Sequence, residues 1–422
     1  TVNGVVYTKR TREQITTGNA STTCTSGITD MSNLFKDKST FKGNIGSWDV
    51  SNVINMREMF FNASSFNQYI GYWNVSSVID MSSMFFQAVT FNQYINNWDV
   101  SNVTNMSFMF SNASSFNKHL INWNVSKVSN MNSMFGRAKS FNQPIDAWNV
   151  SNVTNMSGMF NEATSFNQQI GNWNVSSVTN MQSMFSGATA FNQPIGNWDV
   201  SKVSNMSYMF SGASAFNQPI GTWNMSKVVT MVSMFSGASA FNQPIDNWDI
   251  SKVSQMDSMF SGATSFNQPI GNWNVSQFTR NSWDPTQTGM RLFLLNANNF
   301  NQDLSKWCVK NINSEPIDFS KNSPLIPAYK PKWGADCTTL SNEDFTQLSN
   351  EISIYPNPFV NETKVYVPEN VQIKEIQVVN ALGQTVYTSL LPELNLAHLP
   401  MGMYYVQVKT NQGSVTEKII KK

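Results

Sequence analysis

The chain has 422 residues, of which 41% are hydrophobic and 13% charged, so it can form two or more packed units and is not disordered by composition. Its formal net charge of +1 gives no electrostatic reason to expect binding to nucleic acid or to an anionic membrane, because such binding needs a basic face. It contains no run of about 18 apolar residues, so no segment is expected to span a membrane.

After an N-terminal cap, expected over residues 1–27, a repeat occupies residues 28–310. Ten tryptophans from Trp48 to Trp273 follow one another every 25 residues without insertion or deletion. An unbroken period of this length is typical of stacked-repeat architectures, in which neighbouring copies bury what one copy cannot.

Each copy reads W-x-V-S-x-V-x-x-M-x-x-M-F-x-x-A-x-x-F-N-x-x-I-x-x. The short apolar pattern from Ile195 to Val200 predicts a strand. The spacing i, i+3, i+4, i+7 from Met206 to Ala213 predicts one face of a short helix, with Ser204 or Asn205 as its cap. We therefore expect an α/β repeat solenoid, similar to leucine-rich repeats, of about eleven coils with one long parallel sheet.

Two polar positions recur in every copy. The asparagine after each phenylalanine, such as Asn217, is expected to form a ladder that satisfies backbone groups of the turns. The position after each tryptophan alternates between Asp and Asn, as at Asp49 and Asn74. These oxygens could bind calcium, or they could accept hydrogen bonds from their own backbone. We expect no metal site and no cofactor.

The early coils depart from the repeat at positions that face outward or lie in turns. They carry aromatic side chains where later coils have Ser, Gly, Asn or Pro, which predicts a ligand-binding patch. The alternative is sequence drift in a tolerant turn, or packing under the N-terminal segment. The candidate binding residues are Phe61, Tyr69, Tyr72, Phe86, Tyr94, Phe108 and His119.

The repeat resembles the BspA-like leucine-rich-repeat surface proteins of bacteria and mycoplasmas, through its MF-x-x-A-x-x-FN core and its W-x-V-S-x-V segment. This resemblance covers about residues 20–337. It implies a right-handed α/β solenoid and a role in cell-surface display and adhesion without catalytic activity.

Three cysteines are too few for a disulfide framework, and none forms a CxxC pair. Cys308 and Cys337 close a short loop and are expected to form one disulfide. Cys24 and Cys308 take the same position in coils at opposite ends of the array, so Cys24 is expected to be free. The proline-rich stretch 311–337 is expected to cap the repeat, and the polar stretch 338–350 to be a linker.

Residues 351–422 show short alternating apolar runs separated by Pro and Gly, which predicts a small all-β sandwich. Tyr355-Pro-Asn-Pro358, Asn380-Ala-Leu-Gly-Gln384, Pro400-Met-Gly-Met-Tyr-Tyr405 and a basic tail resemble the C-terminal sorting domain of type IX secretion cargo in Bacteroidetes-type bacteria. The resemblance implies export through the periplasm of a Gram-negative bacterium and recognition by the outer-membrane secretion machinery. The sorting-motif residues are Pro356, Asn357, Pro358, Gly383, Gly402, Tyr404, Lys418, Lys421 and Lys422.

The chemistry of an enzyme is not indicated. The chain has two histidines, His119 and His398, and neither belongs to a Ser-His-Asp or Cys-His arrangement. We expect an exported, non-enzymatic protein, secreted or held at the cell surface, that acts as an adhesin toward a host or matrix protein or a glycan. The alternative is a structural spacer or surface-layer component without a specific ligand.

Overall fold

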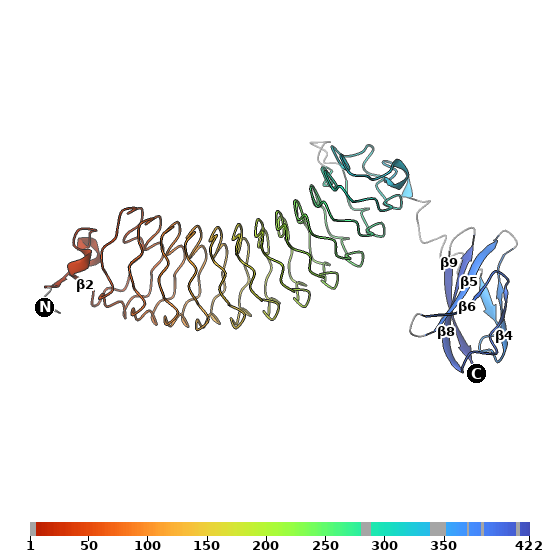
Figure 1. Ribbon diagram of the computed structural model, residues 1–422, viewed down its shortest axis with the longest axis horizontal. Helices are drawn as coiled ribbons and strands as arrows, with labels where there is room; N and C mark the ends of the chain where they lie inside the picture. Colours follow the sequence, from red (N-terminus) through yellow and green to blue (C-terminus); the bar gives the residue numbers. More distant parts are fainter. Residues whose placement is uncertain (1–5, 280–287, 338–351, 369–370, 381–383, 411–413) are drawn as a thin grey trace. The chain divides into compact units, whose positions relative to one another are not determined.

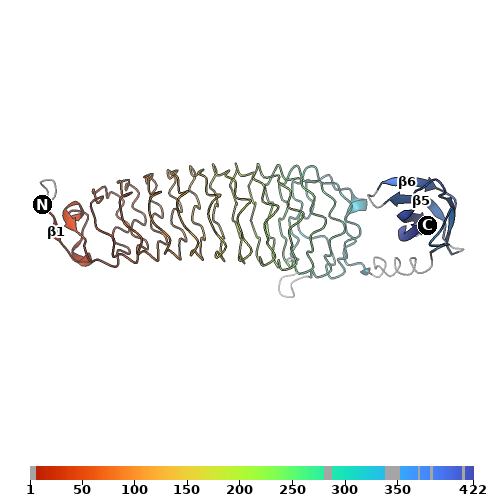
Figure 2. The ribbon, with the colours of Figure 1, turned by 90° about the horizontal axis from the view of Figure 1, so that it is seen from below.

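The computed structural model describes residues 6–279, 288–337, 352–368, 371–380, 384–410 and 414–422. The chain divides into two compact units, Thr1–Ala335 and Asp336–Lys422, and each is described here by itself. The first unit is a stack of similar coils and the second a small group of strands (Figures 1 and 2). The predicted linker at 338–350 lies outside the described residues.

A short cap begins the first unit. Strand β1 (Thr8–Lys9) pairs in parallel with β2 (Thr23–Cys24), and two 3-10 turns, η1 (Arg12–Gln14) and η2 (Ala20–Thr22), lie between them. The guanidinium of Arg10 ties the ends of this loop together, because it donates to the Thr22 carbonyl and to Thr23 Oγ1, both at 2.9 Å. At the other end of the stack a third 3-10 turn, η3, covers Pro327–Tyr329.

The predicted α/β coil with its long parallel sheet, similar to leucine-rich repeats, is wrong. Within the described residues of the repeat there is neither an α-helix nor a strand. Within the described coils, β-pairing between neighbours is limited to one-residue parallel bridges, in a series that runs from Asp30 and Asn55 to Thr230 and Gln255. The segment from Ile195 to Val200, expected as the strand, has no bridge, and the segment from Met206 to Ala213, expected as the helix, is a succession of turns.

The backbone hydrogen bonds explain why no helix forms. Alternate N–H groups of the turn segment leave the coil: Met206 donates to the Thr230 carbonyl at 3.1 Å, and Gly212 donates to the Ser236 carbonyl at 2.7 Å. The N–H groups between them bond three residues back, as Met209 does to Met206 at 3.2 Å. An α-helix would need every N–H to bond four residues back within the segment. Two residues of each turn segment, four positions apart, also have a left-handed φ, with 61° at Tyr208 and 69° at Gly212.

The helical spacing in the sequence instead marks the inward side of this turn segment. Met206, Met209, Phe210 and Ala213 are all fully buried. Their equivalents in neighbouring coils stack along the array, as Phe210 does on Phe235 with ring centroids 5.6 Å apart. The stack therefore has one continuous apolar core that no coil could build alone.

The tryptophans also link each coil to the one before it. The Trp73 indole Nε1 donates to the Ile45 carbonyl at 3.1 Å, and the same bond recurs at every repeat tryptophan up to Trp307. Trp48, the first in the series, finds its acceptor in the cap, at the Ala20 carbonyl (3.0 Å). A buried indole N–H needs such a partner, so the 25-residue period keeps every one of these groups satisfied.

The second unit consists of two antiparallel sheets, so the region that was expected to be all β is rich in sheet. One sheet has the order β3 (Ser353–Tyr355), β4 (Glu362–Tyr366), β7 (Glu393–Asn395). The other has the order β6 (Thr385–Ser389), β5 (Ile373–Asn380), β8 (Gly402–Thr410), β9 (Ser414–Lys421). Buried residues from both sheets, such as Val365 and Val406, belong to one core. Strand β7 was not predicted from the sequence.

No helix in the described part of the chain has the length and apolar character needed to cross a lipid bilayer.

Candidate functional site

The seven predicted binding residues do not form one patch, because three of them contact one another and the other four are exposed elsewhere. Phe61, Phe86 and Phe108 form a phenylalanine cluster. Phe61 and Phe86 stack with ring centroids 4.5 Å apart, and Phe108 meets Phe86 edge-on at 6.4 Å. The ammonium of Lys36 lies 4.8 Å from the centre of the Phe61 ring. Phe61 and Phe86 are therefore partly buried by each other and by Lys36, whereas Phe108 remains 38% exposed.

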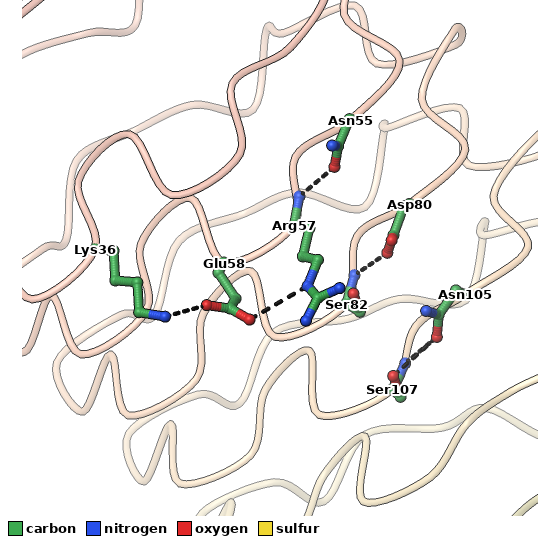
Figure 3. A network of polar contacts seen from close by, with 8 residues as sticks. All are labelled: Lys36, Asn55, Arg57, Glu58, Asp80, Ser82, Asn105 and Ser107. Carbon is green, nitrogen blue, oxygen red and sulfur yellow. Dashed lines mark hydrogen bonds and ion pairs between the residues drawn. The ribbon is translucent and has the colours of Figure 1, made fainter.

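Polar contacts fix the same region. Lys36 forms an ion pair with Glu58, and the second carboxylate oxygen of Glu58 accepts from Arg57 Nε at 3.2 Å (Figure 3). Such partly exposed pairs contribute at most about 1 kcal/mol each. Their effect here is to hold the Lys36 side chain beside Phe61. This arrangement favours local packing as the role of Phe61 and Phe86.

The second group consists of four side chains that do not pack on the phenylalanine cluster and that reach solvent. Tyr69, Tyr72, Tyr94 and His119 are exposed, and we call them the tyrosine surface. The exposed fractions are 41% for Tyr69, 84% for Tyr72 and 58% for Tyr94. Tyr69 and Tyr72 meet edge to face at 5.0 Å, and Lys118 Nζ lies 4.3 Å from the centre of the Tyr94 ring. Local desolvation raises the pKa of the Tyr69 hydroxyl, and the neighbouring Tyr72 adds to the effect.

The backbone beneath the tyrosine surface is held from coil to coil. The predicted asparagine ladder is present: Asn67 Oδ1 accepts from the Asn92 backbone N–H and from Gln93 Nε2, both at 2.9 Å. Gly71 allows two coils to approach closely here, since a Cβ at this residue would lie 2.4 Å from the Tyr94 carbonyl oxygen. The tyrosines therefore project from rigid turns.

The Asp and Asn positions considered for calcium are engaged with their own turns. Asp49 Oδ1 accepts from the Ser51 N–H at 3.1 Å and from the Ser51 hydroxyl at 2.6 Å. These bonds to Ser51 lower the pKa of Asp49. A second series makes the same turn before the buried segment: Asn55, Asp80 and Asn105 accept from the N–H two residues on (Figure 3). Throughout the described residues, no three His, Cys, Asp or Glu side chains come together as a metal site would require.

Of the three cysteines, Cys308 and Cys337 are disulfide-bonded. Cys24 is a free thiol.

Sequence reasoning missed a hollow on the middle coils. It begins at Phe108 and has a volume of about 330 Å³. Tyr208 takes the equivalent position four coils later and is 41% exposed. The sequence did contain a signal for it, because Phe108 and Tyr208 are aromatic at a repeat position where most coils have Ser or Gly. The remaining lining residues are Asn132, Ser133, Ser157, Gly158, Asn161, Gln182 and Ser183.

In the second unit the predicted motif residues lie on both sides of one junction. Asn357 Nδ2 donates to the Lys418 carbonyl at 2.8 Å, and Asn357 Oδ1 accepts from the Ile420 N–H at 3.0 Å. The Tyr-Pro-Asn-Pro segment is thereby joined to the end of β9. Pro356 accepts from Thr363 Oγ1 at 2.8 Å, whereas Pro358 is exposed.

The basic tail is not uniformly available to a partner. Lys418 and Lys422 are exposed, but Lys421 is buried, and its ammonium donates to the Leu396 and Ala397 carbonyls at 2.6 and 2.8 Å. Lys421 therefore fastens the last strand to the loop after β7.

The other motif residues have local roles. The Tyr404 hydroxyl donates to the Pro400 carbonyl at 2.9 Å. Gly402 has a φ of 152°, which favours glycine. Gly383 lies outside the described residues.

Comparison with known proteins identifies both units. A family model described as a secretion system C-terminal sorting domain matches residues 353–422. The chain is accordingly exported by the type IX secretion system, whose machinery is the partner of this domain, and it is secreted or reaches the cell surface. No curated protein matches the chain.

The repeat unit matches a second family model, described as "Mycoplasma protein of unknown function, DUF285". The match consists of four overlapping stretches, at residues 7–121, 86–198, 190–284 and 220–325. These stretches together cover well over half of the 422 residues, so the chain belongs to the DUF285 family. The same chain carries the type IX sorting domain.

Proposed function

We propose that this exported chain is a non-enzymatic adhesin and that the tyrosine surface is where it contacts its ligand. The observation that carries the proposal is the exposure of Tyr69, Tyr72 and Tyr94 on neighbouring coils, up to 84% at Tyr72. Large aromatic side chains on a rigid support supply much contact area at little cost in conformational entropy, and they dominate many binding interfaces.

The surroundings of the tyrosines support a protein or glycan ligand. Gln68 and Gln93, next to Tyr69 and Tyr94, are polar but uncharged, and Lys118 adds one positive charge. The phenylalanine cluster is left out of the proposed surface, because its rings already pack on one another. The resemblance of the repeat to BspA-like surface proteins also supports a role in attachment.

The test uses the full chain, purified and applied to panels of matrix proteins and glycans. In the test variant, Tyr69→Gln, Tyr72→Asn and Tyr94→Gln are combined. Later coils carry the same residues at equivalent positions, namely Gln169 and Asn97, so the fold should tolerate them. Phe86→Ser is the matched control, because Ser111 occupies the equivalent position one coil later.

We expect saturable binding that the triple variant weakens by at least about tenfold and that Phe86→Ser leaves intact. Equal binding by the triple variant and the unmodified chain would show that the tyrosine surface is not the contact site. If the unmodified chain binds none of these ligands saturably, the adhesin proposal fails in favour of a structural spacer.

A further inference from the structure

The hollow that runs from Phe108 to Ser183, which we call the groove, has a different position and lining from the tyrosine surface. Its floor follows one repeat position through successive coils, at Ser133, Gly158 and Ser183. Phe108 lies at one end of this lining, and Tyr208 holds the same repeat position one coil beyond Ser183, four coils from Phe108. With a rise of about 4.8 Å per coil, as for paired parallel strands, the two aromatic residues are about 19 Å apart.

The floor of the groove is rigid, and its backbone is already fully paired. The N–H groups of Ser133, Gly158 and Ser183 donate to carbonyls of the next coil at 2.8 to 2.9 Å. An extended peptide could therefore form no backbone ladder with this floor. A ligand must be recognised by side chains alone.

Several polar side-chain atoms are free to do so. Within the described residues, the hydroxyls of Ser133 and Ser183, the side-chain oxygen of Asn161 and the amide nitrogen of Gln182 make no hydrogen bond. The lining carries no charged side chain. Glu162, which follows Asn161, is paired with Arg137 at 3.0 Å. The groove therefore offers hydroxyl and amide groups but no counterion for an anionic ligand.

The fold does not require an aromatic residue at this repeat position. Phe108 and Tyr208 have φ values of 58° and 61°, a conformation in which a bulky side chain is unfavourable. Ser83, Ser133, Ser183 and Ser233 adopt the same conformation at this position. Tyr208 makes no ring contact with any other described residue, and it remains exposed. Its ring is open for an incoming ligand.

From these observations we infer that the groove binds a linear, uncharged oligosaccharide that lies along the stack, with its ends packed against the Phe108 and Tyr208 rings. The apolar face of a pyranose ring packs on an aromatic ring, while its hydroxyls bond to hydroxyl and amide groups such as those of Ser133 and Gln182. One sugar unit has about the length of one coil rise, so the span between the two rings accommodates about four to five units. This inference does not depend on the adhesin proposal, because it concerns other residues.

The experiment is calorimetric titration of the full chain with linear tetrasaccharides. The neutral probes are cellotetraose, mannotetraose and the tetramer of N-acetylglucosamine, and the anionic probe is the tetramer of galacturonic acid. The variants are Tyr208→Ser, Phe108→Ser and Tyr208→Phe, with Tyr72→Asn as a control on the tyrosine surface. Thermal unfolding of each variant is measured in parallel.

We expect a neutral tetrasaccharide to bind, Tyr208→Ser and Phe108→Ser to weaken it about tenfold each, and Tyr208→Phe and Tyr72→Asn to leave it nearly unchanged. Affinity should rise with sugar length to about four to five units and then level off. Tyr208→Ser should not lower the unfolding temperature, because serine holds this position in other coils.

The inference is overturned if none of the neutral tetrasaccharides binds, if the anionic tetramer binds equally well, or if Tyr208→Ser has no effect on binding. A loss of binding in Tyr72→Asn equal to that in Tyr208→Ser would also overturn it, by placing the sugar on the tyrosine surface.

Discussion

Replacement of Gly212 and Gly262 by alanine tests the unusual backbone of the repeat, because a helix and the observed turns predict opposite signs. Both glycines have a φ of 69°. A Cβ at Gly212 would lie 3.7 Å from the nearest atoms of Gly187, which is ordinary van der Waals contact, and Gly262 is similarly open. The substitution therefore perturbs the backbone conformation without creating a steric clash.

An alanine in a left-handed conformation raises the free energy of the folded state by about 1 to 2 kcal/mol. The substitution also lowers the entropy of the unfolded chain, which offsets less than 1 kcal/mol of this. We expect each substitution to destabilise the repeat by about 1 kcal/mol. The two glycines are two coils apart, so their effects should add to about 2 kcal/mol. In an α-helix, the same double change would instead stabilise the protein by about 1 to 2 kcal/mol.

Urea unfolding followed by tryptophan fluorescence suits this test, because the repeat tryptophans are buried. The matched control replaces both glycines by asparagine, since Asn62 and Asn112 hold this position with φ values of 56° and 61°. The double alanine variant should unfold at a lower urea concentration than the double asparagine variant. If the alanine variant is the more stable of the two, the left-handed assignment is refuted.

Two further predictions concern acid stability and export. Serine hydrogen bonds hold the pKa of the repeat aspartates below the ordinary 3.8, so their stabilisation is complete above that value and is lost as pH falls through the lower folded pKa. The unfolding temperature should therefore fall below about pH 4. It should fall less when Asp49, Asp99, Asp199 and Asp249 are replaced by asparagine, whose side-chain oxygen accepts the same hydrogen bonds without titrating. Lys421→Met should destabilise the C-terminal unit by roughly 2 kcal/mol, because two carbonyls lose a charged donor, and should reduce the amount of protein exported. The exposed Lys422→Met is its control, and equal export by both variants would contradict this role for Lys421.

The sequence identified which repeat residues face inward, but not the backbone that carries them. Met206, Met209, Phe210 and Ala213 have helical spacing because the turn segment returns to the core at the same intervals as a helix would. The contrary signal was the position before Ala213, where Gly and Asn recur in the sequence. Those residue types favour a left-handed conformation and are poor choices for a helix interior.

The C-terminal region was more predictable because each longer strand has its own alternating pattern. Strand β7 was missed because it has three residues and one buried side chain, Leu394, which is too short for an alternating apolar pattern to be recognised. The aromatic departures in the early coils were visible in the sequence, but their division into two groups was not. Phe61 and Tyr69 are close in sequence, yet their rings make different contacts. Tyr208 was overlooked because it stands alone among later coils.

The indole bonds give the array a direction, with consequences for how such chains can vary in length. Each interior coil receives a tryptophan N–H from the next coil and donates one to the coil before, so the junctions up to Trp273 are equivalent. Recombination that adds or removes a whole 25-residue copy leaves every junction intact. The terminal segments are not interchangeable with interior coils: the Ala20 carbonyl receives the first indole, and the Ile317, Phe319 and Lys321 carbonyls receive the last alternate N–H groups. Natural relatives are therefore expected to differ in the number of interior coils while keeping both terminal segments.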